Sequence, residues 1–239
     1  MLVDGINVVR ELLKASAKIE KIVAVDSDNA EIVAIIDKAR AMGVNIQVLE
    51  KKDFDKKIKF KNQGVVAYIP EFKYCEIKDI MLSAERKGEK PFIVILDGIT
   101  DPHNLGAIIR TCECAGVHGV IIPQNRACEV TDTVYRTSAG AVIHVRVAMV
   151  TNITRTIKEL QKMGVWVYAL EAGNKKLYKA DFTYPTALVV GSEGKGVSRL
   201  VLETVDEVLS LDMFGQVNSL NASNASAIAV YEVVRQRSK

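Results

Sequence analysis

Three short segments rich in glycine, asparagine, serine and acidic residues carry the side chains best suited to chemistry. They are Asp97–Arg110 (DGITDPHNLGAIIR), Gly191–Ser198 (GSEGKGVS) and Asn218–Ser223 (NSLNAS). Amides, hydroxyls and carboxylates orient a ligand through hydrogen bonds, and glycines let the backbone approach it closely. Taken singly, each segment is also typical of a turn or a helix cap, so a site requires that they meet in the fold.

Each segment follows a short apolar run that predicts a buried strand. These runs are Phe92–Leu96, Ala187–Val190 and Val208–Leu211, each bounded by turn residues. In open α/β sheets the ligand binds outside the carboxyl ends of the strands. We therefore expect Gly191–Gly196 and Asp212–Asn221 to face one crevice, which is the predicted active site.

Common nucleotide-binding and metal-binding patterns do not account for these segments. A dinucleotide fold requires G-x-G-x-x-G after its first strand, and a P-loop requires G-x-x-x-x-G-K-[ST]. Gly191–Gly196 resembles each only loosely and lies late in the chain. The four cysteines include one close pair, Cys112 and Cys114, and the three histidines are scattered, so we expect no metal site.

The composition is that of an ordinary globular protein. The chain has 239 residues, of which 49% are hydrophobic and 26% charged. It has no apolar run of about 18 residues and no signal-peptide pattern, so we expect a cytoplasmic protein without a membrane segment. The net charge of +3 says little, but Lys51–Lys61 sets six lysines against two aspartates, with Phe54 and Phe60 between them, which suits contact with RNA.

The order of apolar and polar runs predicts two α/β units. Residues 1–70 form a small unit whose first helix is capped by Asp4, and residues 71–90 form a charged linker with a short helix at Ile77–Arg86. The expected elements of the small unit are strands at 21–25, 45–49 and 64–69 and helices at 30–42 and 53–57.

Residues 91–239 form the second unit, an α/β fold with a largely parallel sheet. Trp166, the single tryptophan, is expected in its core. Besides the three strands above, we expect strands at 119–122, 142–147 and 165–170, and helices at 106–115, 130–137, 153–163 and 222–235, with residues 198–205 connecting the last two strands.

The order, residue types and spacing of the three segments resemble the motifs of the SpoU (TrmH-like) branch of the SPOUT RNA methyltransferases. The matching stretches are Asp101–Ala107 with Arg110, Leu188–Val197, and Ser219–Ser223. This family transfers a methyl group from S-adenosylmethionine to a ribose 2′-hydroxyl. The resemblance implies a SPOUT fold with a deep trefoil knot, and a homodimer with the last helix at the interface.

The first unit is similar to the L30e-like RNA-binding domain that precedes the catalytic domain in some members of this family. The likeness is carried by Asp4–Val9 (DGINVV) and Asn62–Ala67 (NQGVVA), with Asn62 where a histidine is usual. With both units in this order, the chain resembles enzymes that methylate a guanosine of 23S rRNA. Relatives that act on tRNA commonly lack such a unit, but a tRNA 2′-O-methyltransferase remains an alternative, as does a non-catalytic RNA-binding or ribosome-assembly protein.

The resemblance also implies the site residues. Asn104 and Asn221 would orient the ribose and Arg110, while Glu193 would hold its loop or the arginine. Arg110 would either take the proton of the hydroxyl or stabilise the forming alkoxide, and the sequence does not choose between these roles. The catalytic set is completed by Ser219, and the residues expected to bind the cofactor are Gly191, Gly194, Gly196, Leu211, Met213 and Leu220. Arg126 and Arg136 are candidate phosphate contacts.

Overall fold

The structure is a computed structural model that describes residues 1–60 and 62–238, so Lys61 of the lysine-rich run lies outside the described residues. The chain divides into two compact units. The first comprises Met1–Lys73 together with Val130–His144, and the second comprises Tyr74–Glu129 and Val145–Lys239. Val130–His144 therefore packs with the first unit although it lies between two strands of the second in the chain.

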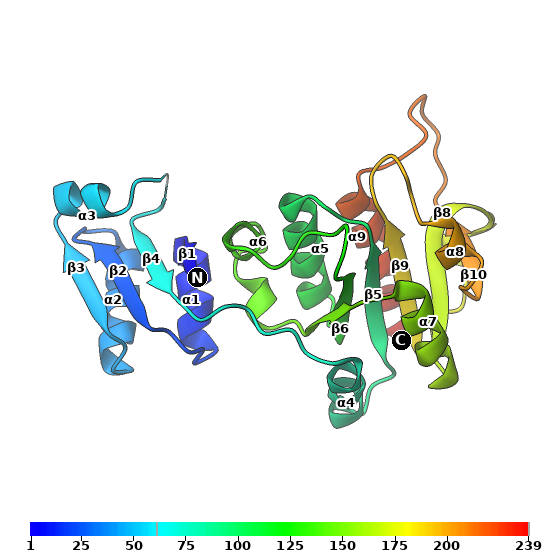
Figure 1. The fold of residues 1–239 in the computed structure, drawn as a ribbon, viewed down its shortest axis with the longest axis horizontal. Coiled ribbons are helices and arrows are strands. Elements are labelled where there is room, and N and C mark those ends of the chain that lie inside the picture. Colours follow the sequence, from blue (N-terminus) through cyan, green and yellow to red (C-terminus); the bar gives the residue numbers. More distant parts are fainter. Residues whose placement is uncertain (61, 239) are drawn as a thin grey trace. The chain divides into compact units, whose positions relative to one another are not determined.

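The first unit is built on a four-stranded sheet of order β1-β4-β2-β3 (Figure 1). β4 pairs antiparallel with β1 and β2, whereas β2 and β3 are parallel. Phe54 and Ile58 pack on Val23 and Val66 to form part of its core. Its elements are β1 (Leu2–Asp4), α1 (Ile6–Lys14), β2 (Lys21–Val25), α2 (Ala30–Ala41), β3 (Ile46–Leu49), α3 (Lys51–Lys57), β4 (Val65–Tyr68), α6 (Asp132–Thr137) and the 3₁₀ helix η1 (Ala141–Ile143).

The second unit contains a six-stranded sheet of order β10-β8-β9-β5-β6-β7, in which all neighbouring strands are parallel. This confirms the predicted α/β fold with a parallel sheet. The register of β5 and β9 pairs Asp97 with Gly191, so the segments that follow these two strands begin at the same edge. The strands are β5 (Phe92–Asp97), β6 (Gly119–Pro123), β7 (Val147–Val150), β8 (Trp166–Lys176), β9 (Thr186–Gly191) and β10 (Glu207–Ser210).

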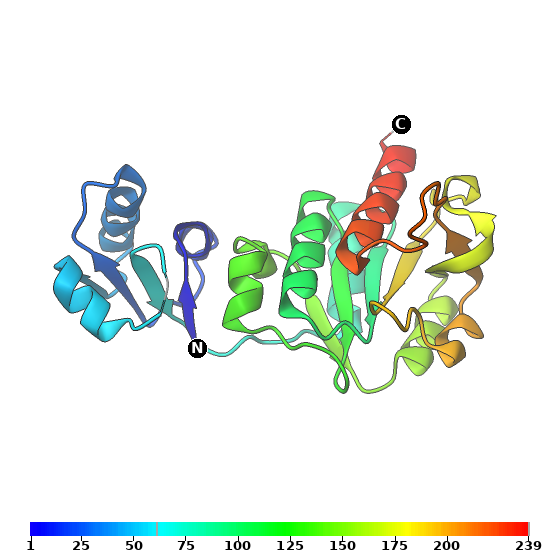
Figure 2. The same cartoon turned by 90° about the horizontal axis from the view of Figure 1, so that it is seen from above.

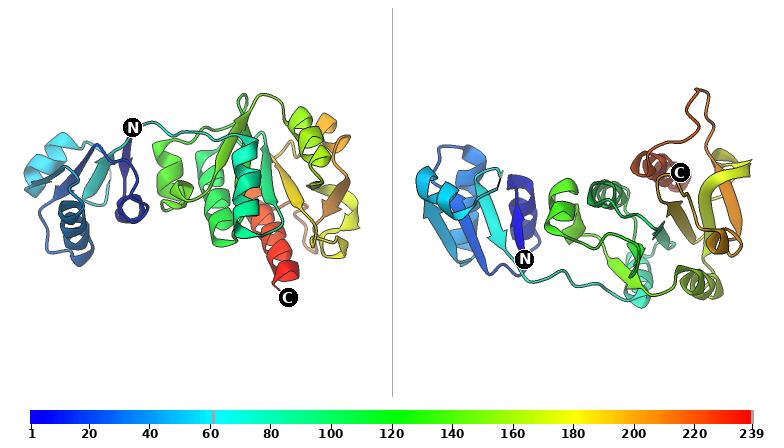
Figure 3. Two further views of the ribbon diagram at one scale, coloured as in Figure 1. Left: turned by 90° about the horizontal axis from the view of Figure 1, so that it is seen from below. Right: turned by 45° about the horizontal axis from the view of Figure 1, so that its top comes forward.

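Helices cover both faces of this sheet. Ile93 and Ile95 of β5 share a buried core with side chains of α4 (Ile77–Lys87), α7 (Ile153–Lys162) and α8 (Arg199–Leu202). α5 (Pro102–Cys114) and α9 (Ala222–Arg237) pack side by side on the other face, as Figures 2 and 3 show. A short 3₁₀ helix, η2 (Leu177–Lys179), follows β8. Within the described ranges, no helix combines the length and the apolar character needed to cross a membrane.

Several local predictions were wrong for identifiable reasons. α5 begins at Pro102 rather than Gly106, because Asp101 caps the helix by accepting the N–H of His103 and proline suits the first helical position. Asp4 is the last residue of β1 and does not cap α1, whose N-cap is Gly5. The strand expected at Val142–Val147 starts only at Val147. Trp166 lies at the beginning of β8 and is 46% exposed, so it is not a core residue.

Candidate active site

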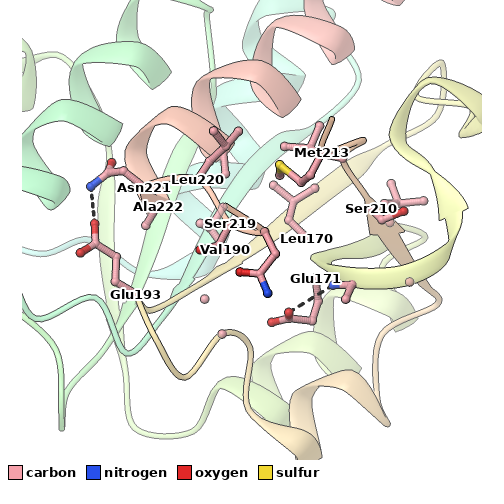
Figure 4. A pocket seen from close by; sticks show the side chains of 18 of the residues that line it. Leu170, Glu171, Val190, Glu193, Ser210, Met213, Ser219, Leu220, Asn221 and Ala222 are labelled. Carbon is pink, nitrogen blue, oxygen red and sulfur yellow. Dashed lines mark hydrogen bonds between the residues drawn. The ribbon is translucent and has the colours of Figure 1, made fainter. Parts of the chain in front are cut away.

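A cavity of about 1010 Å³ lies at the carboxyl ends of β9 and β10, beside the middle of β8 (Figure 4). Its wall includes Leu170, Val190 and Ser210 from these strands and residues 218–222 from the segment that leads into α9. The predicted crevice is therefore present as one open cavity. All six residues predicted to bind the cofactor line it: Gly191, Gly194, Gly196, Leu211, Met213 and Leu220.

The glycine-rich loop after β9 is a tight hairpin. Ser192 and Gly196 exchange two backbone hydrogen bonds, with N···O distances of 3.2 and 2.9 Å. A Cβ atom on Gly191 would lie 2.1 Å from the carbonyl carbon of Gly196, closer than a side chain can approach. Gly194 and Gly196 have φ values of +81° and +64°, which strain other residues. Glycine at these positions thus lets the loop fold back and present its backbone to the cavity.

Glu171 of β8 holds this hairpin in place. Its carboxylate accepts the N–H of Val197 at 2.9 Å and the N–H of Ala172 at 3.1 Å. It also lines the cavity, and a Cβ atom on Gly196 would lie 1.9 Å from its Oε2. The sequence-based prediction missed Glu171 because the strand was expected to end at Leu170. The signal that could have found it is an acidic residue directly after the predicted end of a strand.

The centre of the site is a ring of hydrogen bonds among three predicted residues from distant segments. The Asn104 amide donates to Glu193 Oε1 at 3.0 Å, and the Asn221 amide donates to Asn104 Oδ1 at 3.0 Å. Asn221 Nδ2 also donates to Glu193 Oε1, as drawn in Figure 4. Each side chain is thus fixed by the other two, and among the described residues Glu193 Oε2 has no hydrogen-bond partner.

The local structure explains how the two asparagines of the ring are placed. Asn104 lies in the first turn of α5 and is 9% exposed. Asn221 is the N-cap of α9, and its Oδ1 accepts the N–H of Ser223 at 2.9 Å. Because the cap uses the amide oxygen, the amide nitrogen is left to face Asn104 and Glu193.

Arg110 and Ser219 do not join this ring. Ser219 is exposed and lines the cavity. Arg110 is exposed on α5, is not part of the cavity wall, and has no hydrogen bond or ion pair within the described part of the chain. It lies six residues after Asn104, which rotates it by about 240° around the helix axis, so the two side chains point in different directions.

The segment after β10 is anchored to the strand beside it. Asp212 accepts from Lys176 at 2.7 Å and from the Tyr178 hydroxyl at 3.1 Å. The hydrogen bond from Lys176 keeps the pKa of Asp212 below its usual value. These contacts hold the start of the segment that carries Met213 over the cavity.

A parallel α/β sheet with a glycine-lined cavity at the carboxyl ends of its strands defines a domain that binds a small molecule there. Residues 91–231 match the SpoU rRNA Methylase family, and residues 2–75 match the RNA 2′-O ribose methyltransferase substrate-binding family. The chain is 42% identical over 237 residues to the TrmH family protein YacO of Bacillus subtilis, covering 98% of this chain and 95% of the relative.

Solved structures share the fold along the whole chain. The SpoU methyltransferase AviRb of Streptomyces viridochromogenes, in complex with AdoMet, superposes with a TM-score of 0.83 at 23% identity, covering 99% of this chain and 90% of AviRb. An AdoMet-bound rRNA methyltransferase of Sinorhizobium meliloti gives a TM-score of 0.77 at 25% identity, covering 98% and 86%. The chain belongs to the SpoU (TrmH-like) family of RNA methyltransferases.

Proposed function

We propose that this protein methylates a ribose 2′-hydroxyl of RNA with S-adenosylmethionine, and that the ribose belongs to a guanosine of 23S rRNA. The observation that carries the proposal is the hydrogen-bonded ring of Asn104, Glu193 and Asn221 beside a glycine-lined cavity. Such a ring holds polar atoms in fixed positions next to a bound cofactor, as a transfer reaction requires.

The cavity suits S-adenosylmethionine in its size and its lining. Gly191, Gly194 and Gly196 line the cavity without side chains of their own, and Leu211 and Leu220 supply apolar contact. S-adenosylmethionine would supply a methyl group activated by a positively charged sulfur. Glu171 contributes a carboxylate to the same wall and keeps the hairpin in shape.

The chain's own residues must position the ribose hydroxyl and either accept its proton or stabilise the alkoxide that forms. Asn104 and Asn221 hold Glu193, whose free Oε2 is available to the ribose, as is the hydroxyl of Ser219 in the same cavity wall. Arg110 would stabilise the forming alkoxide as a cation, or accept its proton with help from a substrate phosphate. Guanidinium is almost never deprotonated in proteins, which favours the first role.

The position of Arg110 supports a homodimer in which two copies share each site. Arg110 is exposed, and its position on α5 directs its side chain away from that of Asn104 in its own chain's ring. In a symmetric dimer a residue on this face of α5 can enter the partner's site. We therefore place Arg110 of one copy at the ring of the other.

The two matched families together favour rRNA over tRNA as the substrate. The substrate-binding unit and the lysine-rich α3 suit a large structured RNA. On this proposal the protein is a cytoplasmic enzyme of the RlmB type, with an L30e-like first unit and a knotted SPOUT second unit.

Competition between RNA pools tests the substrate. Equal amounts of unmodified 23S rRNA fragments and unmodified tRNA are mixed with the protein and radiolabelled S-adenosylmethionine. Label in rRNA alone supports the proposal. Label in tRNA alone would show that the substrate is tRNA. Cofactor binding without label in either pool would indicate a non-catalytic RNA-binding protein.

A further inference from the structure

The first unit contains a second cavity, separate from the methyl-transfer site. Its volume is about 330 Å³, close to the lower limit for small-ligand pockets, so it can hold one small planar group but not a duplex. Its wall combines Val8 and Ala139 with several polar side chains. The full lining is Asp4, Gly5, Asn7, Val8, Asn62, Gln63, Arg136 and Ala139.

The start of α1 explains why a carboxylate faces this cavity. Asp4 precedes the helix by two residues and would ordinarily be expected to cap it. Instead Gln63 Oε1 accepts the N–H of Ile6 at 2.8 Å, from a residue 57 positions away. Because the amide of Gln63 takes the capping role, the carboxylate of Asp4 is left for the cavity.

Asp4 is buried and only partly satisfied. Its side chain is 5% exposed, and its Oδ1 accepts from Arg136 Nη1 at 3.1 Å. Among the described residues, no group donates to its Oδ2. Because Asp4 lines the cavity, this oxygen can accept a hydrogen bond from a ligand that brings N–H groups.

Two amide donors at the rim are also unused. Gln63 employs only its Oε1 in the cap, and Asn7 employs only its Oδ1, which accepts from Arg10 at 3.1 Å. The amide nitrogens of both residues have no acceptor within the described chain. Arg136 adds a guanidinium that is 45% exposed, beyond its contact with Asp4. The cavity thus offers a carboxylate acceptor, two amide donors and a cation.

We propose that this cavity binds one unpaired guanine base of the RNA substrate, an inference that rests on the proposed function. The Watson–Crick edge of guanine carries two adjacent donors, N1–H and the N2 amino group, beside the acceptor O6. The donors match the Asp4 carboxylate and O6 matches the amides of Gln63 and Asn7. Adenine and the pyrimidines lack two adjacent donors beside an acceptor, so they would leave Asp4 unsatisfied.

The test uses fluorescein-labelled U11 RNA and the same RNA with a central guanosine, U5GU5, titrated with the full chain and followed by anisotropy. Wild type should bind U5GU5 about tenfold more tightly than U11. Asp4→Asn keeps the shape of the side chain but turns the free acceptor into a donor, so the preference should disappear. Gln63→Glu keeps the capping oxygen but removes the amide donor, so it should weaken the preference. This variant provides the test if Asp4→Asn does not fold.

Asp37→Asn removes the same charge from an exposed position on α2 and should keep the preference. Equal affinity of the wild type for both RNAs, or a preference that survives Asp4→Asn, would overturn the proposal. Methyl transfer to 23S rRNA is measured on the same preparations. Lost guanine preference with intact transfer contradicts only the cavity assignment, and absent transfer with intact preference contradicts only the methyltransferase function.

Discussion

The amide of Asn104 donates a 3.0 Å hydrogen bond to Glu193, a residue 89 positions further along the chain. The bond joins the first turn of α5 to the glycine hairpin after β9, and Asn221 completes the ring from the start of α9. Three loops that are separate in the sequence are thereby held as one polar centre. This centre is the feature on which catalysis should depend most strongly.

Asn104→Asp should reduce methyl transfer by about 100-fold, because it replaces the donor to Glu193 with a second carboxylate and displaces the ring. Asn104→Ala should be less damaging, since it removes the donor without adding repulsion. Steady-state methyl transfer measures both effects. Asn152→Asp, at the N-cap of α7, is the matched control and should retain activity, because aspartate caps as well as asparagine. Wild-type activity in Asn104→Asp would show that methyl transfer does not require the ring.

Mixing two inactive variants should restore activity if Arg110 acts in the partner's site. Arg110→Ala and Glu193→Gln are each expected to be inactive alone, because each removes one component from every site. After co-refolding, half of the dimers are mixed, and each mixed dimer has one intact site, so about a quarter of wild-type activity should return.

Arg110→Ala should also keep the wild-type melting temperature, since the side chain is exposed and unpartnered among the described residues. Activity that stays at zero after confirmed subunit exchange would place Arg110 in its own chain's site.

Gly191→Ala should lower the affinity for S-adenosylmethionine by at least about tenfold, because the added methyl group would overlap the backbone of Gly196 and push the hairpin out of shape. Calorimetric titration measures the affinity. Gly164→Ala controls for a general effect of losing a glycine: it has a positive φ of +80° but open space around it, far along the chain from the hairpin. It should cost about 1 kcal/mol of stability and leave cofactor affinity unchanged. Normal affinity in Gly191→Ala would show that S-adenosylmethionine binding does not depend on the shape of the hairpin.

His118 should make stability depend on pH. Its Nδ1 accepts the N–H of Phe92 at 3.0 Å, so the ring is neutral in this contact, and burial keeps its pKa below the usual value of 6.5. As pH falls below about 6.5, the unfolded chain binds the proton first, so the free energy of unfolding decreases until the folded protein's lower pKa is passed. Above about pH 7 this contribution is constant and fully present.

His118→Asn retains an acceptor near Phe92 but does not titrate. Denaturant unfolding between pH 7.5 and 5 should therefore show a weaker pH dependence in this variant than in the wild type. His103→Asn, an exposed histidine, serves as the control. The same slope in His118→Asn and wild type would show that His118 does not contribute.

The strands that carry the site were predictable from the sequence. The loops and helix starts that follow these strands were less predictable. β5, β9 and β10 are short apolar runs with local turn signals at their ends, and their positions follow from these signals alone. The start of α5 was missed because Asp101 and Pro102 fit a turn as well as a helix start. Whether the caps and turns of three loops meet depends on the strand register, which the sequence pattern does not contain.

Contacts over long sequence distances explain the other differences. Gln63 replaces Asp4 as the cap of α1 from 57 residues away, and no local pattern signals this exchange. Glu171 lies within β8, whose strand continues to Lys176 because β10 pairs with it there. The site residues were predicted from the resemblance to a family. The hydrogen-bonded ring and the separate position of Arg110 became visible only in the structure.

The most direct test of the central claim is transfer of radiolabelled methyl from S-adenosylmethionine to unmodified 23S rRNA fragments, with the product mapped by resistance to alkaline hydrolysis. We expect label at the 2′-oxygen of one guanosine, where the ribose methyl blocks cleavage, and no label with Arg110→Ala. Label on a base, or no label on rRNA despite measurable cofactor binding, would contradict it.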